Sequence, residues 1–336
     1  MSSAPAPQEI ARDATWLAQA LDPGAGMARL VAMDRESYRA ASFLDDRLMQ
    51  QKLDMEIVPW GDIEAAIEGN LRTDARWIFH IGHVGSTLVS RLLGELDAVL
   101  AVREPRLLRD IAISRSEVRA RYVRTIPKLM SRTFAQEEVA CVKATSFASE
   151  IAAELVPPGE RALFIYARPI NYIASILAGE NSVKELHALV EYRRQRLMSR
   201  AIGFPEPRTD ADRAAAAWAC EFTTLEEARE AMPDRKIAWA DFDTMLRNMP
   251  VELGRVARFF GFEASKDALA SIAAGPLMQR YSKDLNYEYS PTLREQLIEQ
   301  EQRLQGRDIN AALAMLRSAS EESPLLAQAL ARAEGS

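Results

Sequence analysis

The sequence has few of the residues that build disulfide scaffolds or metal clusters. It contains 2 Cys and 3 His in 336 residues, spread along the chain, so neither a disulfide framework nor a metal site is expected. Cys141 lies in an apolar run typical of a strand and Cys220 in an Ala-rich run typical of a helix. We therefore expect both to be buried thiols in a reducing compartment. With only 15 Gly and 16 Pro and no internal repeat, collagen-like, low-complexity and solenoid chains are excluded.

Long apolar runs and a positive net charge are also lacking. No apolar run approaches the length of a membrane span, and the N-terminus has neither the basic start nor the apolar stretch of a signal peptide. A cytoplasmic protein without membrane insertion is therefore expected. The formal net charge of −6 argues against broad nucleic-acid binding, which needs a basic surface, but it permits one local basic pocket for a phosphorylated ligand. The oligomeric state cannot be predicted from the sequence.

The middle of the chain alternates between short apolar runs and helical stretches. Four β-prone runs are found, at 77–81, 139–143, 162–167 and 236–240. Strands separated by helices indicate βαβ units and a parallel sheet. The expected fold is α/β, a three-layer αβα sandwich with a mainly parallel central sheet. Ligands bind such sheets at the carboxyl ends of the strands, so the loops after Ile81, Lys143 and Ala167 should gather at one edge.

The two ends of the chain predict helical additions to this core. Residues 1–75 are predicted to be a helical N-terminal extension, because apolar residues recur there at roughly helical spacing. Residues 76–265 form the predicted core. Residues 266–336 are predicted to be a helical C-terminal extension packed on the core, with one long amphipathic helix over 290–319 and a partly frayed tail.

A glycine-containing turn follows the first predicted strand of the core and precedes a helix. It consists of Gly82, His83, Val84, Gly85, Ser86 and Thr87. Glycines let the backbone approach a ligand, and the N–H groups of the first helical turn point at phosphate oxygens. The sequence therefore predicts a phosphate cradle of the P-loop type. It lacks the Lys and the glycine spacing of a Walker loop, which disfavours an ordinary ATPase or kinase.

Three segments together resemble the sulfotransferase family, which uses 3′-phosphoadenosine 5′-phosphosulfate (PAPS) as sulfuryl donor. They are FHIGHVGSTLVSRLL at 79–93, ALFIYARPINYIASIL at 162–177 and IAWADFDTMLRNMPVELGRVARFFGF at 237–262. The resemblance spans about residues 76–262 and rests on the order and spacing of the three segments. It implies the P-loop αβα fold, a PAPS site without metal, and sulfuryl transfer to a hydroxyl or amine of a small-molecule or saccharide acceptor.

The resemblance also implies roles for particular residues. Gly82, His83, Val84, Gly85, Ser86 and Thr87 would hold the 5′-phosphosulfate, and Arg168 and Ser175 would hold the 3′-phosphate. An Arg at a strand end also provides a forked, charge-assisted clamp for phosphate. The family usually has Lys or Arg where His83 stands, so our hypothesis is that His83 assists at the bridging oxygen.

Two further residues are candidates for the chemistry. Glu104, in Arg103-Glu104-Pro105, resembles the Glu-Pro element of the members that use glutamate as base, and sulfuryl transfer requires a base for the acceptor proton. Lys143 lies at the end of a predicted strand, and the resemblance implies that it would position the sulfonate or the base. His80, inside its apolar run, is expected to be a buried histidine with satisfied hydrogen bonds rather than a catalyst.

Two other functions remain open. One is a nucleotide phosphotransferase or hydrolase on a similar loop, although no loop lysine or magnesium-binding carboxylate is identified. The other is a non-catalytic nucleotide-binding protein with a degenerate sulfotransferase site. Metal-dependent activity would favour the first, and binding without turnover the second.

Overall fold

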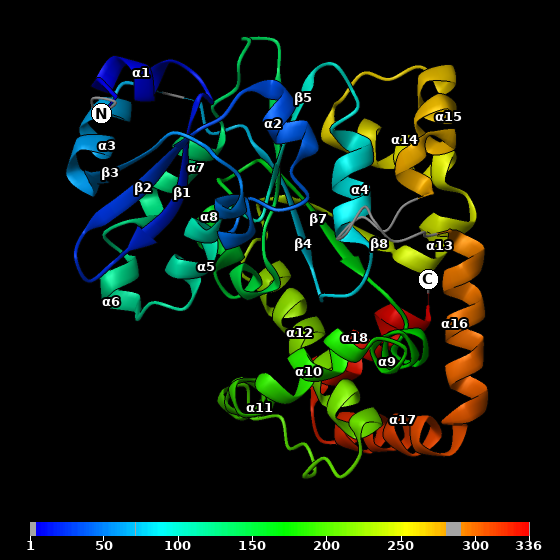
Figure 1. Cartoon of the computed structure of the whole chain (residues 1–336). Coiled ribbons are helices and arrows are strands. Elements are labelled where there is room, and N and C mark those ends of the chain that lie inside the picture. The colour runs from blue at the N-terminus through cyan, green and yellow to red at the C-terminus, as the bar shows by residue number, and fades with distance from the viewer. Residues whose placement is uncertain (1–4, 71, 280–289, 336) are drawn as a thin grey trace.

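The computed structural model describes residues 5–70, 72–279 and 290–335. Five parallel strands form the central sheet, in the order β5-β6-β4-β7-β8 (Figure 1). They are β4 (Arg76–His80), β5 (Val99–Arg103), β6 (Val139–Lys143), β7 (Arg161–Tyr166) and β8 (Lys236–Asp241). The chain enters the sheet at its middle strand, fills one side with β5 and β6, and then crosses to β7 and β8 on the other side.

The strands form because their residues are apolar and buried between two helical layers. Trp77, Ile78 and Phe79 of β4 are fully buried, as expected for a parallel sheet covered on both faces. The four predicted strands are confirmed. The fifth strand, β5, lies at the edge of the sheet and is not among the predicted strands.

Helices cover both faces of the sheet and make the predicted three-layer sandwich. Helix α4 (Ser86–Leu93) packs on β4, β5 and β6, and α14 (Met249–Phe260) packs beside it. Helix α12 (Asp210–Glu230) lies on the other face. The centre of its Phe222 ring is 5.1 Å from the centre of the Tyr166 ring and 5.5 Å from that of the Trp239 ring. The Trp218 indole of α12 donates to the carbonyl of Ala167 at 2.9 Å.

Most of the remaining helices are short and connect the layers. Those before β7 are α1 (Pro7–Arg12), α2 (Arg35–Ala40), η1 (Asp46–Gln50), α3 (Trp60–Ile67), α5 (Arg106–Ala112), α6 (Ser116–Arg119), η2 (Val123–Thr125), α7 (Ile126–Met130), η3 (Ser146–Ile151) and α8 (Ala152–Leu155). Those after β7 are α9 (Pro169–Leu177), α10 (Glu180–Ala188), α11 (Val190–Ser199), α13 (Phe242–Arg247), α15 (Lys266–Ala274), η4 (Pro276–Met278), α16 (Pro291–Leu304), α17 (Gly306–Glu321) and α18 (Pro324–Glu334).

The N-terminal segment is not the helical extension that the sequence predicted. It forms an antiparallel sheet of β1 (Trp16–Asp22), β2 (Met27–Ala32) and β3 (Met55–Pro59), with short helices around it. The hairpin turn is built on Asp22, whose carboxylate accepts from the N–H groups of Gly24 and Ala25, and on Gly26 at a φ of +66°. This Asp-Pro-Gly-Ala-Gly turn was the overlooked signal, because such residues mark turns between strands.

The C-terminal segment is helical, as predicted, but its helices differ from the expected ones. The single helix expected over 290–319 is divided into α16 and α17 at Gln305, which has a φ of −116° and a ψ of 20°. The tail forms a third helix, α18, instead of fraying. Arg332 of α18 pairs with the fully buried Glu226 of α12 and stacks on the Trp239 ring at 4.4 Å. The division of the chain at residues 75 and 265 stays a prediction.

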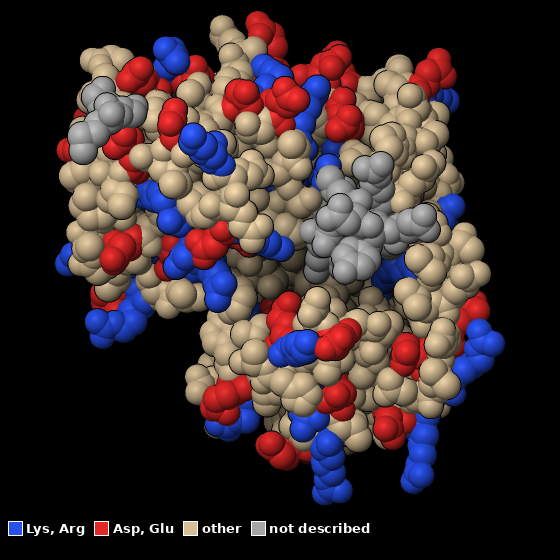
Figure 2. Space-filling model, viewed as in Figure 1, with Lys and Arg blue, Asp and Glu red and all other residues tan. Residues whose placement is uncertain are grey.

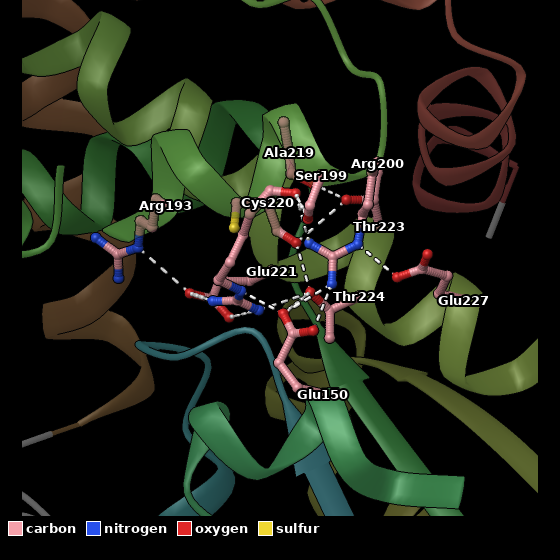
Figure 3. Close-up of polar contacts among 11 residues, drawn as sticks. Glu150, Arg193, Ser199, Arg200, Ala219, Cys220, Glu221, Thr223, Thr224 and Glu227 are labelled. Atoms are coloured by element: carbon pink, nitrogen blue, oxygen red, sulfur yellow. Dashed lines mark hydrogen bonds and ion pairs between the residues drawn. The ribbon is translucent and has the colours of Figure 1, made fainter. Parts of the chain in front are cut away.

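A largely buried network of charges joins α11 and its C-cap residue Arg200 to α12 and η3 (Figure 3). Arg196 donates to Glu221 at 3.0 Å, Arg193 donates to the same carboxylate at 3.3 Å, and Arg200 donates to both oxygens of Glu150 at 2.7 Å. Burial alone would raise the pKa of the Glu150 carboxyl, but Arg196 and Arg200 lower it below its ordinary value. Because each charge has opposite charges beside it, the network can fix these helices without leaving a buried charge uncompensated.

Candidate active site

The loop between β4 and α4 has the backbone of a phosphate cradle. Three of its residues have positive φ values, +76° at Gly82, +52° at His83 and +61° at Gly85. Such values are easy for glycine and strained for other residues, and strain of this kind concentrates at functional sites. Gly85 caps α4 without a side-chain hydrogen bond, and the first turn of α4 holds no acidic residue. The N-terminus of α4 therefore has the electrostatics of an anion site.

Gly85 is required by packing as well as by its φ value. A Cβ atom at this position would overlap the ring of Phe242, the residue that follows β8. Ser86 and Thr87, next in the chain, are buried at the start of α4, and Val84 is fully buried. The loop that follows β4 is thus packed closely against the residue that follows β8.

Glu104 and Lys143 form an ion pair beside this loop. Glu104 follows β5 and Lys143 ends β6, and the Lys143 ammonium donates to Glu104 Oε1. The Glu104 N–H also donates to the Lys143 carbonyl at 2.8 Å, and Glu104 has a positive φ of +52°. The Lys143 side chain is 1% exposed and lies 5.5 Å from the centre of the Phe43 ring. The two residues chosen for the chemistry are therefore in direct contact.

The pair determines the charge of the carboxylate. Burial alone would raise the pKa of Glu104, but the Lys143 ammonium and the neighbouring His80 ring lower it well below its ordinary value. Glu104 is therefore ionised at neutral pH, in the form that can accept a proton. His80 Nε2 lies 3.6 Å from Glu104 Oε1.

His83 lies in the loop but its ring is turned toward α10. Its Nδ1 is 3.2 Å from the Ser182 hydroxyl, and its Nε2 is 3.5 Å from the carboxylate of Glu185. In this arrangement His83 links the loop to α10. Its role at the bridging oxygen stays a prediction.

Arg168 lies on the same edge of the sheet, directly after β7 and before α9. Its side chain is 40% exposed, and its Nε lies 3.8 Å from Asp241 at the end of β8. Ser175 is half-buried two turns into α9. The fold thus brings Glu104, Lys143, Arg168 and the loop to one edge of the sheet, and Ser175 lies in the helix that begins directly after Arg168.

No functional role is predicted from the sequence for the residues at the end of β8 and directly after it. Asp241 accepts from the N–H of Asp243 at 3.1 Å and from the hydroxyl of Thr244 at 3.0 Å, and its pKa is raised by burial and by Asp243. Asp243 in turn pairs with Arg294 of α16, whose guanidinium lies 5.2 Å from the centre of the Phe242 ring. The strand itself was predicted, so applying the strand-end rule to its loop would have found them.

One face of the molecule carries mixed charge. Figure 2 shows Lys and Arg interspersed with Asp and Glu on this face, and a hollow between the part that holds the sheet and the helices below it. Over the described ranges, no group of three or more His, Cys, Asp or Glu side chains could hold a metal ion. No helix within the same ranges is long and apolar enough to cross a membrane.

The comparisons with known proteins return structures but no sequence relatives. No protein-family profile matches the chain, and no curated protein does. Among solved structures, a sulfotransferase domain from the curacin biosynthetic pathway is 10% identical, with a TM-score of 0.39, over 66% of this chain and 85% of that one. The sulfotransferase domain of the Synechococcus PCC 7002 olefin synthase is 12% identical, with a TM-score of 0.39, over 66% and 86%.

A mouse sulfotransferase, SULT7A1 complexed with PAP, is 8% identical, with a TM-score of 0.39, over 77% of this chain and 89% of that one. These likenesses are too distant to assign a substrate or a residue role to this chain. The chemistry of the site therefore has to be argued from its own residues.

Proposed function

We propose that this chain is a sulfotransferase that moves a sulfuryl group from PAPS to a hydroxyl or amine acceptor. The observation that carries the proposal is the meeting of four features at one sheet edge. These are a glycine-containing loop with three positive φ values, the uncapped N-terminus of α4, an ionised Glu104 paired with Lys143, and Arg168 at the adjacent strand end. Together they offer an anion cradle, a base and two cations.

The residues present fit an anionic nucleotide donor. The N–H groups at the start of α4 and the hydroxyls of Ser86 and Thr87 would hold the 5′-phosphosulfate. Arg168, partly exposed on the neighbouring strand end, would hold the 3′-phosphate with a charge-assisted clamp, and Ser175 would assist from α9. No metal is needed in this arrangement, because the donors that neutralise the charge belong to the chain.

The transfer step follows from the Glu104–Lys143 pair. The acceptor oxygen or nitrogen forms a bond to sulfur as the bond from sulfur to the bridging oxygen breaks, and adenosine 3′,5′-bisphosphate leaves. The acceptor proton passes to the Glu104 carboxylate. Lys143, and His83 if its ring turns from α10 into the loop, would stabilise the charge that develops on the sulfuryl group and the leaving oxygen. As the Lys143 ammonium shifts toward that charge, its hold on Glu104 weakens and the carboxylate becomes a stronger base.

Donor turnover tests the proposal. Purified protein is incubated with PAPS and mixed alcohol, phenol, saccharide and amine acceptors, and release of the bisphosphate is measured beside a reaction with ATP and Mg²⁺. The proposal predicts release from PAPS without added metal and its loss in Glu104→Gln. Metal-dependent turnover of ATP would instead indicate a phosphotransferase or hydrolase. Binding of both nucleotides without turnover would indicate a non-catalytic nucleotide-binding protein.

A further inference from the structure

His80 lies between the loop and the ion pair, and its ring contacts both. It is the last residue of β4, and its side chain is 7% exposed. Its Nδ1 accepts a hydrogen bond from the Gly82 N–H at 3.0 Å, and its Nε2 lies 3.0 Å from the Ala144 carbonyl oxygen. A backbone N–H can only donate and a carbonyl can only accept. The ring therefore fits its site as one neutral tautomer, with the proton on Nε2.

The same Nε2 faces the candidate base. It lies 3.6 Å from Glu104 Oε1, the oxygen to which the Lys143 ammonium donates. One ring therefore reaches the ends of three strands, with the loop after β4 on one side and the residues that follow β5 and β6 on the other. Because both ring nitrogens contact backbone groups, the ring is poorly placed to take the acceptor proton itself.

We propose that His80 is a positioning residue that holds the anion-binding loop through Nδ1 and the Glu104–Lys143 pair through Nε2. This inference rests on the proposed function and adds a residue to it. The loop and the base belong to different strands, so each could shift independently. A buried ring that contacts both fixes the distance between the donor site and the base, on which transfer depends.

The two contacts can be separated by substitution. In His80→Asn the short amide can accept from the N–H two residues on, as Asn does in turns, so the loop contact is kept and the contact to Ala144 and Glu104 is lost. In His80→Gln the longer amide reaches toward the Nε2 position, so the Ala144 contact is kept and the loop contact is lost. The two variants form a matched pair of similar size and polarity.

The proposal predicts opposite effects in this pair. His80→Gln should bind adenosine 3′,5′-bisphosphate roughly 3–10-fold more weakly, the loss expected for one hydrogen bond, with kcat at saturating PAPS near wild type. His80→Asn should keep the affinity and lower kcat about tenfold or more. A fold-wide defect would lower both quantities in parallel in both variants, and that result would overturn the proposal.

The pH profile gives a readout that a structural role would not move. Among the described residues, the groups that act on the Glu104 carboxyl are Lys143 from β6 and His80 from β4, and both lower its pKa. Loss of the His80 ring should therefore raise the pKa of Glu104. The acid limb of the kcat–pH profile should then lie at higher pH in His80→Asn than in wild type. An unchanged acid limb in a variant with lowered kcat would contradict the proposal.

The tautomer of the His80 ring can be determined without an activity assay. Nitrogen-15 NMR of the imidazoles resolves protonated from unprotonated ring nitrogens, and the His80 signals are assigned by their loss in His80→Asn. We expect a proton on Nε2 and none on Nδ1 at neutral pH. A proton on Nδ1 would overturn the inference even if the enzyme is active. A wild-type protein with the expected tautomer but no affinity for the bisphosphate would instead show that the proposed function has failed.

Discussion

Replacing Gly85 by Ala should destabilise the fold more than the same change at Gly82, and the difference measures how closely the loop is packed. Both glycines have positive φ values, +61° and +76°, so both substitutions impose a strained backbone worth roughly 1–3 kcal/mol. At Gly82 a Cβ would meet nothing within 4 Å, whereas at Gly85 it would overlap the Phe242 ring. Overpacking of this kind adds about 1–3 kcal/mol. Gly85→Ala should therefore cost roughly 2–6 kcal/mol in total.

The assay is urea unfolding of wild type, Gly82→Ala and Gly85→Ala, with free energies compared only where the m-values agree. A third variant, Gly85→Ala with Phe242→Ala, removes the ring that the new methyl group would meet. Because the two residues are in contact, their effects should not add, and the double variant should lose less stability than the sum of the single ones. Equal losses at Gly82 and Gly85, or strictly additive effects, would refute the reasoning.

Three further predictions concern charges. Glu104→Gln should lower kcat by roughly 10²–10⁴-fold, measured at saturating donor, and leave bisphosphate affinity near wild type; a fully active variant would exclude Glu104 as base. The lowered pKa of Glu104 stabilises the fold above its ordinary value of 4.5, and this contribution is lost as the pH falls below 4.5. The urea midpoint of wild type should therefore fall more steeply with acid than that of Glu104→Gln, and parallel curves would contradict this. Arg196→Met, which breaks a buried pair with Glu221, should cost about 3–5 kcal/mol in urea unfolding, whereas the exposed Arg194→Met should cause little or no loss; equal losses would show that the network contributes little.

The core of the fold could be predicted because its signals are local. Runs of apolar residues interrupted by helical periodicity define a parallel sheet, and the glycines at 82 and 85 mark the turn after its first strand. The same rule that places ligands at strand ends correctly placed Lys143 and Arg168 on one edge. Glu104 was chosen through the resemblance, and the structure places it against Lys143.

The missed features depend on contacts between distant segments. The N-terminal segment has a weak helical periodicity although it forms a hairpin. Only the turn residues from Asp22 to Gly26 indicate the hairpin instead of a helix. The pairing of His83 with α10 requires residues about a hundred positions apart, as does the stacking of Arg332 on Trp239. The spacing of residues in the sequence does not predict toward which neighbouring element a histidine ring in a loop will point.

The most direct test of the central claim is a calorimetric titration of the protein with adenosine 3′,5′-bisphosphate, beside ATP with Mg²⁺. The variants are Arg168→Ala and, as a matched control, Arg317→Ala, whose side chain is 67% exposed on α17. The account predicts that wild type and the control bind the bisphosphate in preference to ATP with Mg²⁺, and that Arg168→Ala loses this preference. Binding of ATP with Mg²⁺ alone, or of neither nucleotide, would contradict the assignment of the donor site.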